Sequence, residues 1–134
     1  MTGVPHLDLS DAGQLMPILQ RHGFYTNKSL GQHFLISRKV LTAIIDASLL
    51  ESGLPVLEIG PGVGTVTRAL AEEGAHVTAV ELDRRALTVL QDTVGSFPDV
   101  QVVQGDILTI DLPALLDAPC WTVVGNLPYY ITTP

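Results

Sequence analysis

The strongest constraint on the fold of this chain is an apolar run that ends in closely spaced glycines. Residues 55–59 have the nearly continuous apolar character of a strand buried in a parallel sheet. Three glycines follow at alternate positions, Gly60, Gly62 and Gly64, and a helical pattern begins directly after them. Because glycine has no Cβ, such a loop can turn sharply and approach a ligand closely. The strand, loop and helix together predict the nucleotide-binding opening of a doubly wound α/β fold.

The spacing of these glycines distinguishes between nucleotide-like ligands. A dinucleotide site usually has the pattern G-x-G-x-x-G, whereas here the third glycine comes one residue earlier. An acid, Glu58, also stands two residues before the first glycine. The pattern E-x-G-x-G-x-G favours methyltransferases that use S-adenosylmethionine over nicotinamide oxidoreductases. An ordinary glycine-rich turn without a ligand is the remaining alternative.

The rest of the chain alternates between strand-like and helix-like patterns. Further strands are expected at 76–80, 100–103 and 121–124, and helices at 10–22, 38–51, 65–73 and 83–94, with a helical turn at 112–116. Ser10 or Asp8 is expected to cap the first helix, in which Pro17 predicts a kink or a later start. Ser37 and Asp83 are expected to cap two of the later helices.

Alternating units of this kind form right-handed crossovers and a parallel sheet. We therefore predict an α/β, Rossmann-like fold of the S-adenosylmethionine-dependent methyltransferase type, with a parallel sheet of which the chain supplies four strands. Residues 1–36 are expected to form an N-terminal helix and a basic loop arm. Residues 37–134 are expected to form a partial cofactor-binding domain.

Each predicted strand ends at a glycine or a polar residue that can contact a ligand: Gly60, Glu81, Asp106 and Asn126. Glu81 follows Gly60 by 21 residues, where an acid accepts hydrogen bonds from the ribose hydroxyls of an adenosine. A carboxylate at Asp106 can accept a hydrogen bond from the adenine amine, and Leu82 and Ile107 can sandwich the ring. Each residue also has a structural alternative. Glu81 can be an exposed acid at the start of a helix and Asp106 can form a turn, while Leu82 and Ile107 can be ordinary core residues.

The segment Asn126-Leu127-Pro128-Tyr129 predicts catalysis on an aromatic amine. Such an amine is a poor nucleophile because its lone pair is delocalised into the ring. Acceptors at Asn126 Oδ1 and the Leu127 carbonyl would free that lone pair, while Pro128 stiffens the loop. Tyr129 can stack on an extruded base. The alternative is a turn whose aromatic residues cover the edge of the sheet.

Charge and cysteine content exclude several other functions. The net charge is −7, and twelve of the fourteen acids fall in residues 41–134, so this part alone is expected to bind RNA poorly. Cys120 is the only cysteine, so no intrachain disulfide or cysteine zinc cluster is possible, and no metal site is expected. The first twenty residues lack lysine and arginine, and no apolar run is long enough for a membrane span. A cytoplasmic location is the expectation.

Five segments in order resemble the KsgA/Erm family of ribosomal RNA adenine dimethyltransferases. They are Lys-Ser-Leu-Gly-Gln-His-Phe-Leu at 28–35, Glu-Ile-Gly-Pro-Gly-Val-Gly at 58–64, Val-Glu-Leu-Asp at 80–83, Gly-Asp-Ile-Leu at 105–108 and Gly-Asn-Leu-Pro-Tyr-Tyr at 125–130. The resemblance implies donor contacts at His33, Leu35, Gly60, Glu81, Asp106 and Asn126. It also implies that Gln32 and its neighbours close over the donor and that Asn126 and Tyr129 hold the target adenine.

The resemblance further implies two successive methyl transfers from S-adenosylmethionine to one adenine amine, as a step of ribosomal RNA processing. The implied partner is ribosomal RNA or a ribosomal subunit precursor, with the small-subunit enzyme favoured over the large-subunit, resistance-type one. Family members continue past this loop into further strands and a helical RNA-binding domain, whereas this chain stops at Pro134. We therefore expect a fragment with little activity that can self-associate, from a monomeric protein. A non-catalytic nucleic-acid-binding relative is the alternative.

Overall fold

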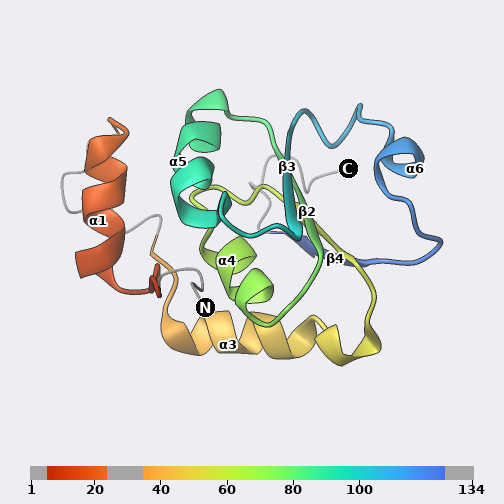
Figure 1. The fold of residues 1–134 in the computed structure, drawn as a ribbon, viewed down its shortest axis with the longest axis horizontal. Coiled ribbons are helices and arrows are strands. Elements are labelled where there is room, and N and C mark those ends of the chain that lie inside the picture. Colours follow the sequence, from red (N-terminus) through yellow and green to blue (C-terminus); the bar gives the residue numbers. More distant parts are fainter. Residues whose placement is uncertain (1–5, 24–34, 126–134) are drawn as a thin grey trace.

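A computed structural model describes residues 6–23 and 35–125 of the chain. Its centre is a four-stranded sheet in the order β3-β2-β1-β4, and all neighbouring strands are parallel (Figure 1). The strands are β1 (Val56–Ile59), β2 (Val77–Glu81), β3 (Val100–Gln104) and β4 (Thr122–Gly125). The register pairs Val56 with Val77 on one side and with Thr122 on the other. The parallel sheet predicted from the alternating pattern is thus confirmed.

The helices cover the two faces of the sheet unequally. They are α1 (Ala12–Arg21), α3 (Arg38–Ala47), α4 (Thr65–Glu72), α5 (Arg84–Val94) and the short α6 (Leu112–Leu115), with a 3₁₀ turn, η1, at Leu50–Ser52. Helices α4 and α5 lie against one face, and α3 packs on α4 (Figure 1). The connection between β3 and β4, which carries α6, lies on the other face.

Alternating strand residues supply a core on each side of the sheet. Val56, Val77 and Ala79 pack with buried residues of α3 and α4, namely Leu41, Val66 and Leu70. Leu57 and Val80 point the other way and pack with Leu116 and half-buried residues around α6. Burial on both faces explains why residues 55–59 are apolar without alternation.

Two of the predicted caps are confirmed and one is wrong. The side chains of Ser37 and Asp83 accept hydrogen bonds from the amides of Val40 and Arg85, at 3.2 and 2.9 Å. The first helix is capped by Asp11, not by Ser10 or Asp8. Asp8 is instead held by the side chains of Ser10 and Arg38. The helix begins at Ala12, later than predicted, and continues through Pro17 to Arg21.

Helix α3 is shorter than the predicted range of 38–51. It ends at Ala47, and Leu49 then adopts a positive φ of 52°, which an α-helix cannot accommodate. The chain resumes as the 3₁₀ turn η1 before Gly53. The apolar pattern of this segment is compatible with one longer helix, so only the backbone conformation reveals the break.

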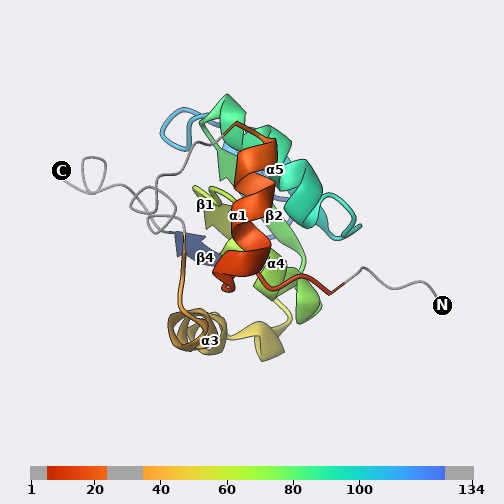
Figure 2. The ribbon, with the colours of Figure 1, turned by 90° about the vertical axis from the view of Figure 1, so that its left-hand side faces the viewer.

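Helix α1 lies across the outside of α5 and the glycine loop (Figure 2). Its buried residues Leu15, Ile18 and Leu19 form one cluster with Val63 of the loop and Val89 of α5. Two side chains at its carboxyl end reach Asp92 of α5: His22 Nε2 at 2.6 Å and Arg21 at 3.4 Å. Within residues 6–23 and 35–125, no helix is long and apolar enough to cross a membrane.

Candidate functional site

The carboxyl ends of the first three strands meet at one edge of the sheet. The amide of Gly60 donates to the Val80 carbonyl at 2.9 Å, and the amide of Gly105 donates to the Glu81 carbonyl at 3.0 Å. The end of β4 pairs beside that of β1, because Gly125 is in register with Ile59. This edge is where open α/β sheets bind their ligands.

The three glycines of the loop all have positive φ, at 70° for Gly60, 59° for Gly62 and 94° for Gly64, but their surroundings differ. A Cβ at Gly62 would meet no atom of residues 6–23 and 35–125 within 4 Å, so within this part of the chain its Cα faces open space. A Cβ at Gly64 would lie 2.5 Å from Thr93 Oγ1 and 3.0 Å from Leu90 Cδ2, both in α5. Gly62 therefore leaves room for a ligand, whereas Gly64 lets α4 and α5 pack closely.

Glu81 is a buried carboxylate held in place by the backbone. Its side chain accepts the amide N–H of Gly62 on Oε1 and that of Asp83 on Oε2, both at 2.9 Å. The residue is 8% exposed, so the alternative of an exposed helix-starting acid does not describe it. Each oxygen of an ionised carboxylate has a further lone pair, so both can still accept a hydroxyl from a ligand.

Asp106 and its neighbours form a partly exposed turn after β3. Asp106 Oδ1 accepts the amide of Leu108 at 2.9 Å, which is the turn-forming contact named as its structural alternative. Ile107 is half-buried near α6, whereas Leu82 is 59% exposed beyond the end of β2. Leu35 packs against the cluster that contains Val63 of the glycine loop.

Glu58 is a second buried acid beside the loop. It is 4% exposed, and its Oε1 accepts a hydrogen bond from Thr67 Oγ1 in α4. Burial raises the pKa of the Glu58 carboxyl from 4.5 to about 7, the Thr67 hydrogen bond opposes that rise, and the negative charge of Glu81 adds to it. In the sequence, Glu58 indicated only the type of glycine loop. The hydroxyl residue nine positions later was the signal that it has a partner in the following helix.

The remaining predicted site residues lie outside the described part of the chain. They are Gln32, His33, Asn126, Leu127, Pro128 and Tyr129. Their roles, and those of Leu82, Asp106 and Ile107, stay predictions. The residues that the structure does bring together are Gly60, Gly62 and Glu81, to which it adds Glu58 and Thr67.

Comparison with known proteins gives the family of this fold. One curated relative is a ribosomal RNA small subunit methyltransferase A from Shouchella clausii, 42% identical over 132 residues, which are 95% of this chain and 45% of the relative. The chain therefore spans less than half the length of that protein. A solved 23S rRNA methyltransferase, ErmE, has a TM-score of 0.62 and 37% identity over 73% of this chain and 38% of its own.

A third similar structure was solved with a bound ligand. The glycopeptide N-methyltransferase MtfA, solved with S-adenosyl-L-homocysteine, has a TM-score of 0.52 and 27% identity over 63% of this chain and 34% of its own. The family model of ribosomal RNA adenine dimethylases matches residues 23–134, which include all four strands. The truncated Rossmann-like fold is therefore that of a methyltransferase, and the chain belongs to the ribosomal RNA adenine dimethylase family.

Proposed function

We propose that this chain holds S-adenosylmethionine and is the donor-binding part of an enzyme that dimethylates an adenine amine in small-subunit ribosomal RNA. The observation that carries the proposal is the Glu81 carboxylate, buried beside the open side of Gly62 and fixed by two amides. Family membership supports the adenine substrate, and the name of the relative from Shouchella clausii supports the small subunit. The MtfA complex with the demethylated product supports the donor.

In this proposal the donor lies along the carboxyl edge of the sheet. The free lone pairs of Glu81 accept both ribose hydroxyls. Asp106 uses Oδ1 within its own turn, so Oδ2 is left to accept the adenine amine. The exposed Leu82 and the half-buried Ile107 cover the two faces of the adenine ring. Leu35 then continues the wall of the site on the side of the glycine loop.

The acceptor side of the proposed reaction belongs to the segment after β4. When bound, the donor supplies an electrophilic methyl group on a sulfonium. Asn126 Oδ1 and the Leu127 carbonyl accept the two N–H groups of the target amine, so its lone pair points at that methyl carbon. Pro128 holds the turn and Tyr129 stacks on the base. With the donor bound, the amine nitrogen would take its methyl group as the bond from that carbon to the sulfonium sulfur breaks, and the amine would then lose a proton to water.

Replacing Glu81 with alanine should weaken binding of S-adenosylmethionine by about 10- to 100-fold. The reason is the loss of a charged acceptor for the ribose hydroxyls. One hydrogen bond to a charged group contributes about 1.5–3 kcal/mol net, which is about 10- to 150-fold in affinity, and two bonds to one carboxylate are not additive. Calorimetric titration of the 134-residue chain measures the affinity. Glu51→Ala is the control, because Glu51 is an exposed acid away from this edge.

Because Glu81 also accepts two backbone amides, each variant is first checked by its circular dichroism spectrum and melting temperature. Equal affinities for the Glu81 variant and the parent would contradict the donor site. Binding of NADH with fluorescence enhancement would favour the oxidoreductase alternative instead. For a longer protein that contains this chain, methyl incorporation into small-subunit particles separates the enzyme from a non-catalytic relative.

A further inference from the structure

The outer side of α3 and α4 carries a groove whose lining residues are not those of the proposed donor site. Two adjoining hollows, of about 260 and 510 Å³, share the residues Ile45, Asp46 and Glu73. The first extends along α4 from Thr65 to Glu73, and the second continues past η1 to Glu51. We refer to the two hollows together as the α3–α4 groove.

The α3–α4 groove is strongly acidic. Five carboxylates line it, those of Asp8, Asp46, Glu51, Glu72 and Glu73. Among the described lining residues the guanidinium groups are those of Arg38 and Arg68, so the carboxylates outnumber them by three. An acidic groove repels the phosphates of RNA and attracts cationic side chains.

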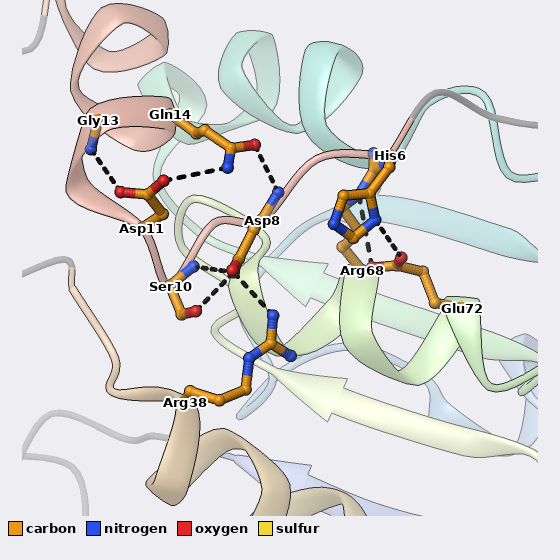
Figure 3. A network of polar contacts seen from close by, with 9 residues as sticks. All are labelled: His6, Asp8, Ser10, Asp11, Gly13, Gln14, Arg38, Arg68 and Glu72. Atoms are coloured by element: carbon orange, nitrogen blue, oxygen red, sulfur yellow. Dashed lines mark hydrogen bonds and ion pairs between the residues drawn. The ribbon is translucent and has the colours of Figure 1, made fainter.

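The two arginines are already engaged within the protein (Figure 3). Arg38 pairs with Asp8 at 2.9 Å, and Arg68 donates to the Thr93 carbonyl at 2.8 Å and lies 3.6 Å from Glu72. By contrast, Asp46, Glu51 and Glu73 form no ion pair with any residue in the described ranges. These three acids are therefore the ones that can meet an external positive charge.

The floor of the groove is apolar and contains one unsatisfied polar group. Leu41, Ile45 and Ala69 line the first hollow between the charged residues. Thr65 lines it as well; it is 4% exposed, and its hydroxyl has no hydrogen-bond partner among the residues that the structure describes. A floor of this kind suits an aliphatic stem with a polar end.

We propose that the α3–α4 groove binds a basic polypeptide segment that carries lysine or arginine. The stems of its cationic residues lie on the apolar floor, and their charged ends meet Asp46, Glu51 and Glu73. The groove runs along α4 from Thr65 to Glu73, a rise of about 12 Å, which is the length of about four residues of an extended bound chain. The identity of the partner rests on the proposed function, since a ribosomal particle presents basic protein segments beside its RNA.

The test is a fluorescence anisotropy titration at about 0.15 M salt with a labelled peptide, Lys-Leu-Lys-Ala-Lys-Leu-Lys. The double variant Asp46→Asn/Glu73→Gln should bind it about five- to tenfold more weakly than the parent, as expected for two lost charge pairs near the surface. The matched control is Asp99→Asn/Asp117→Asn, which removes the same charge outside the groove. The control should change the affinity by less than about twofold, because long-range charge is largely screened.

Equal weakening by the two double variants would overturn the proposal, because the peptide would then sense only net charge. The proposal would also be overturned if the parent protein did not bind the peptide, or if it bound more tightly a peptide in which every lysine is changed to glutamate. Displacement of the peptide by a single-stranded RNA heptamer would assign the groove to RNA and overturn it as well. Titration with S-adenosylmethionine on the same samples keeps a failure of the groove separate from a failure of the donor site.

Discussion

Replacing Gly64 with alanine should lower the free energy of unfolding by about 3 kcal/mol. About 1–2 kcal/mol comes from forcing a side chain into the left-handed backbone region at φ 94°. A further 1–3 kcal/mol, roughly, comes from overpacking, since the new Cβ would lie 2.5 Å from Thr93 Oγ1. This is a large fraction of the stability of an ordinary domain, about 5–15 kcal/mol. Urea unfolding followed by circular dichroism measures the change.

Gly62→Ala is the matched control for this prediction. Its φ of 59° also favours glycine, but a Cβ there meets no atom of the described residues within 4 Å. We expect a loss of only about 1 kcal/mol in stability, from the backbone alone. Adding Thr93→Ala to the Gly64 variant should recover part of its loss, because it removes the closest contact. Equal destabilisation by the two glycine variants, with no rescue, would show that packing against α5 is not the cause.

The contrast between the two glycines shows where the sequence was sufficient and where it was not. Their spacing correctly indicated a loop between a strand and a helix, because positive φ and glycine are tightly linked. Spacing alone assigned Gly60, Gly62 and Gly64 a common role beside the cofactor. What Gly64 touches is decided by α5, about thirty residues further along the chain, and a local pattern carries no information on that contact.

The parallel arrangement of the strands was predictable for a similar reason. Apolar runs and caps are local, and right-handed crossovers then restrict the sheet to few arrangements. The first helix cap was wrong because Asp8, Ser10 and Asp11 are all good caps, and the choice depends on Arg38. Arg38 engages Asp8, so Asp11 is the acid that remains for the helix. Such competition is tertiary and cannot be read from the segment itself.

The sequence also did not reveal that Glu58 and Glu81 are buried. Glu58 and Glu81 are both predicted to lie near the carboxyl edge, but the sequence does not state how far each is removed from water. In the structure the amides of Gly62 and Asp83 hold Glu81, whereas a single hydroxyl, from Thr67, holds Glu58. Glu58 is therefore a buried acid with a raised pKa next to a proposed site, which is typical of functional residues. Burying such an acid often lowers the stability of the folded protein. That cost can be measured.

Replacing Glu58 with glutamine should remove a dependence of stability on pH. The pKa of Glu58 is raised to about 7 in the folded chain from an ordinary value of 4.5. Between these values the folded state binds a proton that the unfolded state has released, so the free energy of unfolding falls as pH rises. At about 1.4 kcal/mol per unit, the parent should lose about 3 kcal/mol between pH 4.5 and 7 through this group, and little more above pH 7.

Glutamine is neutral at every pH, so the variant should lack this loss. The measured quantity is the difference in unfolding free energy between variant and parent, from urea titrations at pH 5, 6, 7 and 8. The contributions of the other titrating groups are the same in both proteins and cancel in that difference. As pH rises, the unfolding free energy of the variant should therefore increase relative to that of the parent by about 3 kcal/mol. Glu51→Gln, which changes an exposed acid, should give a nearly constant difference. Parallel curves for Glu58→Gln and the parent would mean that Glu58 is ionised in the folded chain throughout this range, because water or a nearby donor compensates its burial.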